Sequence, residues 1–373
     1  TTTTDDLAAR ALNFGPVDLL LVCINGRLGN MSATEAAKLA SEIRPRLAVP
    51  IHYGMFPNNT ADPDTFTTPL RRAGLMSDTL EVGARVSIAD LLGECAGALP
   101  FDGVVPPVVT PLRPDETLDE EALRRLIAKL VKAGCGGLFF CGTAGLGPSL
   151  SDAVFSLTLE VALEATPDGV AAMAGVMEPS TARAKERLRR AGDIGYTYAV
   201  LAAPTFLPPR KDSEFLAHFG ECQKASALKL IAYNLPSYTR CSIPVNALLA
   251  MHSRGWIHAV KESSGDALYF ADLCQRAAAA GLPVFQGNRP EFAHLAQLGA
   301  VGIVPVPSNL DPELYVRAWK ARNAAPDKIA AFQSKSDALW HSLVDGYDFL
   351  SGILQKLGDE GIGTGHCPLP WTQ

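Results

Sequence analysis

The sequence predicts an α/β protein whose larger part is a (β/α)8 TIM barrel with a C-terminal helical extension. The first observation is an alternation after Phe101, where short apolar runs are followed by amphipathic helix patterns, eight times in about 220 residues. Such a series favours a closed parallel barrel over an open sheet. The second is a different pattern of apolar and polar residues before residue 100, which predicts a small partial α/β segment. We therefore expect three parts: the segment 1–98, the barrel 99–324, and C-terminal helices with a tail, 325–373.

Strands of the barrel are predicted where apolar or β-branched residues run together between turn residues. In chain order they are Val104–Thr110, Gly136–Cys141, Val170–Val176, Tyr198–Ala203, Leu228–Tyr233, Ile257–Lys261, Pro283–Gln286 and Gly302–Val304. Helices should begin between them, near Asp119, Ser149, Ser180, Asp212, Pro244, Asp266, Arg289 and Asp311. Asp119 illustrates the signal, because this capping residue precedes apolar residues spaced three and four apart. Further helices are predicted over Ala325–Lys356.

The first segment has its own elements. Strands are predicted over Val17–Ile24 and Arg46–His52, helices over Ser32–Ile43 and Asp64–Ala73, and a hairpin-like stretch over Thr79–Ile88. The small residues of GECAGALP (93–100) read as a linker to the barrel.

Composition excludes several classes of protein. The 373 residues are 47% hydrophobic and 19% charged, a globular balance, and the net charge of −6 gives no electrostatic basis for a nucleic-acid partner. The longest apolar runs, such as residues 17–24, are shorter than the ~20 residues of a membrane span, and no secretory signal is visible. Eight cysteines without a C-x-x-C pair predict reduced thiols in a cytoplasmic protein. No cofactor is predicted.

Lys261 is the most informative candidate for catalysis. It ends a strand that should be buried on both faces, and the active site of such a barrel lies at the carboxyl ends of its strands. Burial disfavours the charged form of an amine, which makes it a nucleophile able to form a Schiff base with a carbonyl carbon. The alternative is a lysine that turns to solvent or pairs with Glu262.

Two neighbouring features favour the first interpretation. Tyr233 ends the preceding strand, so its phenol could relay protons beside the amine. The turn GTAGLG (142–147) supplies the Thr143 hydroxyl and unhindered backbone N–H groups suited to a carboxylate. This turn lacks the lysine and the spacing of nucleotide-binding loops. The alternative for Tyr233 is a core tyrosine with a satisfied hydroxyl.

Residues from about 101 to 357 resemble the dihydrodipicolinate synthase/N-acetylneuraminate lyase family of pyruvate-type, class I aldolases. The resemblance rests on GTAG (142–145), YNLPSYT (233–239), VKESSGD (260–266), QGN (286–288) and GAVGIVPV (299–306). It implies a (β/α)8 barrel with helical extension, a homo-oligomer (dimer or tetramer), and a small 2-oxo acid as the substrate.

The same resemblance implies roles for residues. Lys261 matches the Schiff-base lysine, Tyr233 the catalytic tyrosine, and Thr143 the hydroxyl of a proton relay. Gly142 and Ala144 belong to the turn that holds the substrate carboxylate, and the main chain of Ile303 matches one that faces the keto acid.

The departures from the family pattern decide the expected reaction. Leu146 replaces an acid and Ala144 lacks a hydroxyl. Tyr238 stands where lysine-pathway synthases place an arginine for their second substrate, and Phe206 stands where they place a tyrosine donated across a dimer interface. We therefore expect a Schiff-base aldolase or lyase acting on a 2-oxo acid, such as a 2-oxo-3-deoxy sugar acid, rather than a true dihydrodipicolinate synthase. A sugar-acid dehydratase and a catalytically impaired barrel serving as scaffold or metabolite sensor are the alternatives.

Residues 17–92 resemble the C-terminal portion of a metallo-β-lactamase-fold hydrolase of the L-ascorbate-6-phosphate lactonase group. The resemblance rests on INGRLGNM (24–31), EAAKLA (35–40) and VPIHYGMFPNNTADPDTF (49–66). His52 matches a late zinc ligand, but the chain has no H-x-H-x-D-H cluster, so we expect no metal site. A fragment with few strands exposes unpaired edges, so we predict that residues 1–95 mediate assembly or bind a partner chain.

Overall fold

The structure is a computed structural model that describes residues 4–12, 17–26, 30–45, 47–54, 61–73, 75, 77, 79, 101–287, 292, 298–345 and 348–368. It divides into two compact units, Thr1–Ala96 and Gly97–Gln373. The two units are described separately below. The linker predicted over 93–100 and most of the hairpin-like stretch predicted over Thr79–Ile88 lie outside the described residues.

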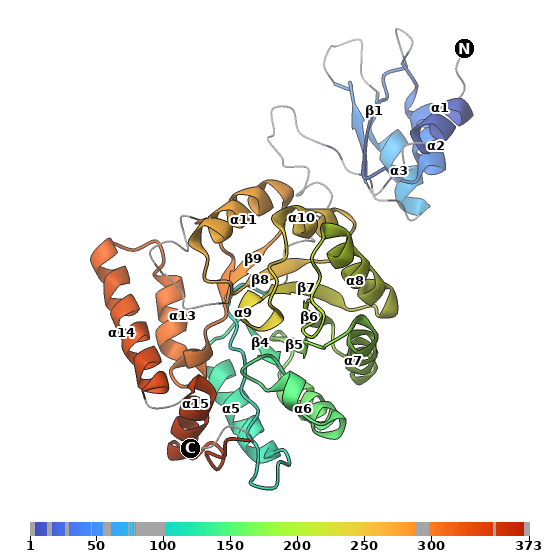
Figure 1. Cartoon of the computed structure of the whole chain (residues 1–373). Helices are drawn as coiled ribbons and strands as arrows, with labels where there is room; N and C mark the ends of the chain where they lie inside the picture. Colours follow the sequence, from blue (N-terminus) through green and yellow to red (C-terminus); the bar gives the residue numbers. More distant parts are fainter. Residues whose placement is uncertain are drawn as a thin grey trace. The chain divides into compact units, whose positions relative to one another are not determined.

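The larger unit is the predicted barrel (Figure 1). Its eight strands are all parallel and follow the order β3-β10-β9-β8-β7-β6-β5-β4. Backbone bonds from Val108 N to Phe139 O (2.9 Å) and from Phe139 N to Pro106 O (3.0 Å) join the segment after β3 to β4, which closes the ring. The strands are β3 (Gly103–Val104), β4 (Gly137–Phe140), β5 (Ala171–Val176), β6 (Tyr198–Ala202), β7 (Lys229–Asn234), β8 (Ala259–Glu262), β9 (Val284–Gln286) and β10 (Gly302–Ile303).

Helices surround this ring and begin where the capping residues predict. Asp119 accepts a hydrogen bond from Ala122 N at 3.1 Å, and Ser180, Asp266 and Asp311 cap their helices in the same way. The helix predicted near Ser149 instead begins at Asp152, because residues 147–149 form a 3-10 turn and Ser151 is the cap. The helix predicted near Arg289 lies outside the described residues. The helices are α5 (Glu120–Lys132), α6 (Asp152–Ala165), α7 (Thr181–Ile194), α8 (Asp212–Ala225), α9 (Pro236–Thr239), α10 (Val245–Ser253), α11 (Ala267–Ala280) and α13 (Pro312–Lys320).

The predicted C-terminal extension is confirmed as two further helices, α14 (Pro326–Val344) and α15 (Phe349–Asp359). Figure 1 shows α14 outside α13. The hydroxyls of Tyr315 and Ser336 lie 2.9 Å apart and tie these two helices together inside the protein.

The barrel unit has two apolar cores. An outer core lies between strands and helices, with Leu126, Leu159 and Phe219 fully buried in it. An inner core fills the barrel, because side chains alternate between the two faces of each strand. The inner core consists of Phe101, Val105, Phe139, Met173, Met177, Tyr198, Val200, Ala202, Ile231, Tyr233, Leu235, Ala259, Phe285 and Val304.

In the described part of the smaller unit, two parallel strands pack with three helices. Strands β1 (Leu19–Cys23) and β2 (Leu47–Ile51) pair directly, and α2 (Ala33–Ile43) connects them after a capping box formed by Ser32 and Glu35. Helix α3 (Asp64–Arg72) follows as predicted. Helix α1 (Thr4–Leu12) was not predicted; its short apolar face, including the buried Ala8, is too brief to stand out in a polar sequence.

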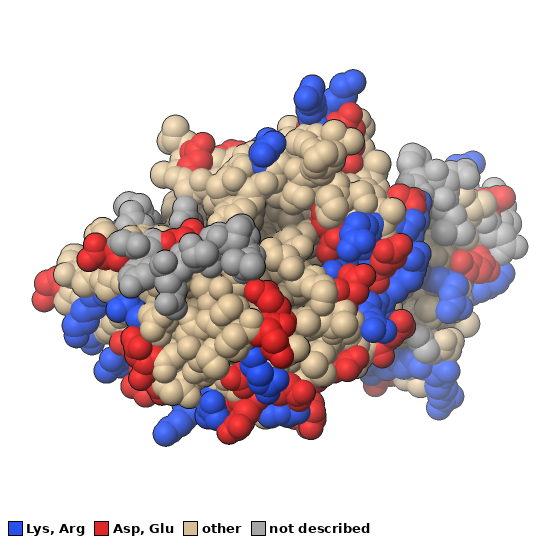
Figure 2. All heavy atoms as spheres, turned by 60° about the horizontal axis from the view of Figure 1, so that its bottom comes forward, with Lys and Arg blue, Asp and Glu red and all other residues tan. Residues whose placement is uncertain are grey.

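Charges are mixed on the surface. Figure 2 shows Lys and Arg side chains interspersed with Asp and Glu, so that neither sign dominates the face in view. Within the described ranges, no helix combines the length and apolarity that crossing a membrane requires.

A buried histidine should make the fold sensitive to acid. His218 Nε2 lies 3.1 Å from the Ala202 carbonyl and Nδ1 lies 2.9 Å from the Thr181 hydroxyl, and burial lowers the pKa of His218 from 6.5 to about 4. Between these values the unfolded chain binds a proton that the folded chain does not, so stability falls as the pH drops from about 6.5 towards 4, by up to roughly 3 kcal/mol.

We therefore expect His218→Gln to lose less thermal stability than wild type between pH 7 and pH 4.5, measured as the change in Tm. The variant keeps a hydrogen-bonding side chain but cannot titrate. Equal losses in both proteins would contradict the assignment.

Candidate active site

Lys261 and Tyr233 lie side by side at the carboxyl ends of adjacent strands. They are register partners in the parallel ladder between β7 and β8, and both side chains are almost fully buried, at 5% and 3% exposure. All four residues of β8 are buried, the ionisable Lys261 and Glu262 included. Burial alone lowers the pKa of Lys261 well below its usual value, which favours the neutral amine.

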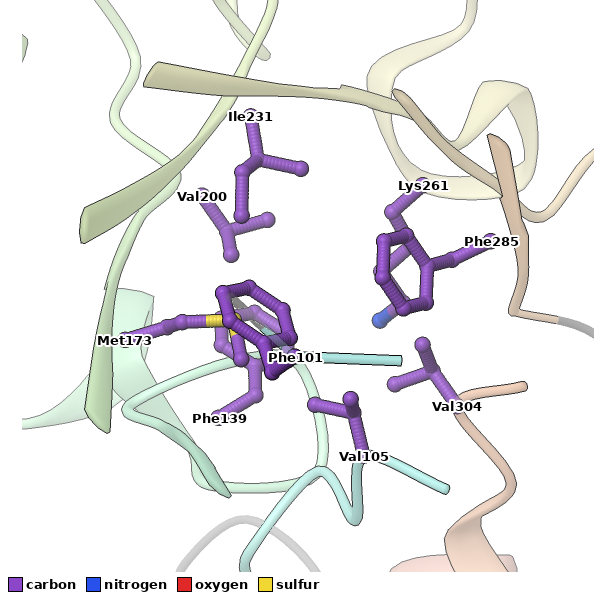
Figure 3. Close-up of a pocket in the computed structure, with 9 residues that line it drawn as sticks. All are labelled: Phe101, Val105, Phe139, Met173, Val200, Ile231, Lys261, Phe285 and Val304. Atoms are coloured by element: carbon purple, nitrogen blue, oxygen red, sulfur yellow. The ribbon is translucent and has the colours of Figure 1, made fainter. Parts of the chain in front are cut away.

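The Lys261 amine enters an apolar interior. Figure 3 shows its side chain extending from β8 among side chains that come from around the ring. Its Nζ lies 3.9 Å from the ring centre of Tyr233 and 4.5 Å from that of Phe139. The cavity beside it, inside the barrel, has a volume of about 10 Å³, room for roughly one water, and its lining does not include the turn after β4. Its lining is Phe101, Val105, Phe139, Met173, Val200, Ile231, Lys261, Phe285 and Val304.

A chain of hydroxyl groups leads away from the amine. The Tyr233 oxygen lies 3.5 Å from the Thr143 hydroxyl, which also lies 3.7 Å from the sulfur of Met177. Burial raises the pKa of Tyr233 to about 12, although hydrogen bonding with Thr143 and Ser263 acts in the opposite direction. The phenol is therefore protonated at neutral pH and is suited to relaying a proton, not to acting as a free base.

The turn after β4 is shaped by close packing. Cys141 and Leu146 adopt left-handed backbone conformations, with φ of 50° and 60°. A Cβ on Gly147 would lie 1.9 Å from the Cys141 carbonyl oxygen, so only glycine fits there. The Thr110 hydroxyl donates to the Gly145 carbonyl at 2.6 Å. This anchoring holds the turn beside the barrel axis.

Backbone donors of the same turn are available to a ligand. The N–H groups of Thr143, Ala144 and Gly145 donate no hydrogen bond to any residue that the structure describes. Three adjacent donors beside the Thr143 hydroxyl form a site that suits a carboxylate.

Glu262 does not neutralise the lysine. Its carboxylate accepts a hydrogen bond from Asn234 Nδ2 at 2.6 Å and another from the backbone N–H of Ser264. Asn234 Oδ1 in turn accepts from Ile243 N at 2.9 Å. Burial raises the pKa of Glu262, and these hydrogen bonds partly offset it. Lys261 therefore neither turns to solvent nor pairs with Glu262, the two alternatives that the sequence left open.

Not all of the other site residues predicted from the sequence lie beside Lys261 and Tyr233. Ile303 lies in β10 with its side chain in the outer core, and its carbonyl accepts from Val105 N at 2.9 Å within the ladder. Phe206 is 78% exposed in the loop after β6, and Tyr238 is 51% exposed in α9 after β7. The Ala144 methyl group also faces the outer core. The structure thus brings together Lys261, Tyr233, Thr143 and the turn that begins at Gly142.

Two residues near the site escaped sequence reasoning. Ser263 lies two positions after Lys261 and so shares its inward face; its buried hydroxyl fills the space where a Cβ on Gly287 would otherwise lie. Met177 lies on the inward face after β5 in the same way. The period of two along each strand was the signal that could have identified both.

Metal-ligand geometry is absent from the part of the chain that the structure describes, since no three His, Cys, Asp or Glu side chains gather there. His52 contacts Cys23, with its Nδ1 3.3 Å from the sulfur.

Comparison with known proteins identifies the family of the barrel unit. Residues 100–373 match the family described as the dihydrodipicolinate synthetase family. A 4-hydroxy-tetrahydrodipicolinate synthase from Methanothrix thermoacetophila is 30% identical over 221 residues, which cover 59% of this chain and 74% of that protein.

Solved structures show the same fold. A dihydrodipicolinate synthase from Bacteroides thetaiotaomicron is 25% identical, with a TM-score of 0.69 over 74% of this chain and 94% of that one. A prophage protein of the dihydrodipicolinic acid synthase family from E. coli, solved in complex with pyruvate, is 22% identical, with a TM-score of 0.68 over 73% of this chain and 93% of that one.

The close packing of β5 against the turn after β4 can be tested by substitution. A Cβ on Gly175 of β5 would lie 2.2 Å from the Cys141 carbonyl oxygen, so we expect Gly175→Ala to lower the free energy of unfolding by about 2–3 kcal/mol in urea denaturation. Gly192→Ala in α7 is the control: nothing lies within 4 Å of its Cβ, so it should be neutral or stabilising. Similar effects of the two changes would refute the packing argument.

Proposed function

The chain belongs to the dihydrodipicolinate synthetase family, and we propose that it is a lyase that forms a Schiff base between Lys261 and a small 2-oxo acid. The observation that supports this most directly is the buried Lys261 amine beside Tyr233. A neutral, desolvated amine is the form that adds to a carbonyl carbon.

Each part of the site has a role in the proposed reaction. The turn N–H groups and the Thr143 hydroxyl hold the carboxylate, while Lys261 Nζ adds to the keto carbon to give a carbinolamine. Loss of water then gives the imine. In aldol cleavage the electrons of the broken carbon–carbon bond move into the imine and leave an enamine and an aldehyde. The proton of the substrate hydroxyl passes through the Tyr233 and Thr143 hydroxyls, which lie 3.5 Å apart.

The substrate differs, in this proposal, from that of the relatives named synthases. Tyr238 offers no guanidinium for the carboxylate of a second substrate, and the Phe206 ring cannot pass a proton. Aldol cleavage and dehydration begin with the same imine, and a 2-oxo-3-deoxy sugar acid would suit either reaction. Product analysis separates the two.

Borohydride trapping tests the proposal. We expect pyruvate and borohydride to give a reduced adduct on Lys261, located by peptide mass spectrometry. Lys261→Arg should abolish it, because a guanidinium stays charged and cannot form the imine. Lys229→Arg, which changes an exposed lysine on β7, is the matched control and should label normally.

Borohydride trapping also distinguishes an active lyase from the alternative of a catalytically impaired barrel. Tyr233→Phe should label more slowly, by about 10²-fold, because it removes one proton relay. No adduct in a folded wild-type protein would overturn the lyase proposal and favour a scaffold or sensor.

We further propose that the protein assembles into oligomers and that the smaller unit takes part. Among the described residues β1 pairs with β2 alone, and its Leu21 is 52% exposed. A paired strand with one open edge and an apolar side chain is suited to adding another chain. We also propose that this unit is similar to the closing part of a metallo-β-lactamase fold, with His52 at a residual ligand position. Leu268 at the start of α11 is 85% exposed and is a second candidate for contact.

Light scattering with two variants tests assembly. Leu21→Glu should lower the oligomer mass if β1 makes the contact, and Leu268→Glu should do so if the barrel face makes it, because a buried unpaired charge opposes association. A monomeric wild type would contradict the proposal, as would a mass that neither variant changes.

A further inference from the structure

We infer that one wall of the barrel mouth, at the ends of β5, β6 and β7, binds an apolar group on the 2-oxo acid. The favoured substrate would then carry an aryl or alkyl tail, not a polyhydroxylated chain. This inference rests on the proposed Schiff-base function and, within the 2-oxo acids, favours an apolar tail over the sugar-acid chain considered above.

The wall is formed by three inward-facing side chains. Met177 follows β5, Ala202 ends β6, and Leu235 follows β7. All three belong to the inner core that contains Tyr233, and they are 5%, 1% and 7% exposed. They therefore lie on the side of the mouth that Tyr233 shares, with no hydroxyl, amide or charge among them.

The charged residue nearest this wall in the sequence, Glu178, is paired with arginines of α7. Glu178 follows Met177 directly, but its carboxylate lies 3.0 Å from Arg183 and 3.2 Å from Arg187 on α7. Thr239, at the end of α9, donates its hydroxyl to the backbone carbonyls of Leu235 and Cys241. These polar groups are thus already engaged by the protein.

Polar groups of the mouth flank this wall on both sides. Thr143 and the turn N–H groups follow β4, the neighbour of β5, and Ser263 follows β8, the neighbour of β7, with its hydroxyl buried. The keto acid end of a substrate is best satisfied by these groups and Lys261, which leaves Met177, Ala202 and Leu235 for the rest of the molecule. A buried hydroxyl left without a partner costs about 1–3 kcal/mol, so each unpaired hydroxyl of a sugar chain would weaken binding at this wall.

The loops that follow β6 and β7 also carry apolar side chains. Phe206 and Leu207 are each 78% exposed after β6, and Tyr238 is 51% exposed after β7. Exposed aromatic and aliphatic side chains at a mouth are suited to covering an apolar tail once it is bound. Arg240, exposed two positions after Tyr238, is the group that would instead favour an anionic tail.

Met177 is the residue best placed to set the preference. Its sulfur lies 3.7 Å from the Thr143 hydroxyl, so the side chain spans from the wall to the proposed relay. A flexible thioether adapts its shape to aromatic and aliphatic partners. Met177→Gln keeps the length of the side chain but places an amide in the wall.

The experiment measures aldol addition of pyruvate to two probe aldehydes, benzaldehyde and glyceraldehyde. We expect wild type to give at least tenfold higher kcat/KM with benzaldehyde. Met177→Gln should lower the benzaldehyde-to-glyceraldehyde ratio at least tenfold. Leu157→Gln, at an exposed position on the outer face of α6, is the matched control and should leave the ratio unchanged.

Each outcome has a defined meaning. An equal or higher kcat/KM with glyceraldehyde overturns the inference. A Met177→Gln variant that loses both activities equally has only a structural defect at this position, which also overturns the role of Met177. If pyruvate and borohydride leave no adduct on wild-type Lys261, the Schiff-base proposal itself fails. An adduct together with the wrong aldehyde preference refutes the apolar wall alone.

Discussion

Burial of one amine inside a parallel barrel is the constraint on which the rest of this site depends. Lys261 is 5% exposed, and its Nζ lies against the rings of Tyr233 and Phe139 with no carboxylate beside it. A charged ammonium would lose its hydration there without gaining an ion pair, so the neutral form is favoured. The surrounding inner core therefore determines the chemistry of the amine as well as the stability of the barrel.

Neighbouring interactions maintain that environment. The ladder between β7 and β8 places Tyr233 and Lys261 on the inner face, and it places Asn234 and Glu262 on the outer one. The hydrogen bond between the latter two keeps the Glu262 carboxylate occupied and directed away from the amine. One register thus separates a buried base from a buried acid, because successive side chains of a strand point to opposite faces.

At the mouth of the barrel, polar groups flank an apolar wall. Thr143, Ser263 and the turn after β4 offer hydrogen bonds, whereas Met177, Ala202 and Leu235 offer only apolar surface. In the proposed function Lys261 and Tyr233 supply the imine chemistry, and the wall of the mouth selects what is attached to the 2-oxo acid. Residues that differ from the relatives' pattern are thus the informative ones for substrate choice.

The sequence by itself determined the barrel, most of the described helix starts and the central pair, because strand periodicity and capping residues act locally and Lys261 and Tyr233 end adjacent predicted strands. It did not determine that helix α1 would form, that Ile303 would have its carbonyl engaged in the ladder, or that the Ala144 methyl group would face the outer core. Only the tertiary structure decided which inward residues share one level of the barrel, and so placed Met177 against Thr143 across 34 positions of sequence. The reason is physical: strand tilt and closure of the ring set the height of each side chain, and no local pattern encodes that height.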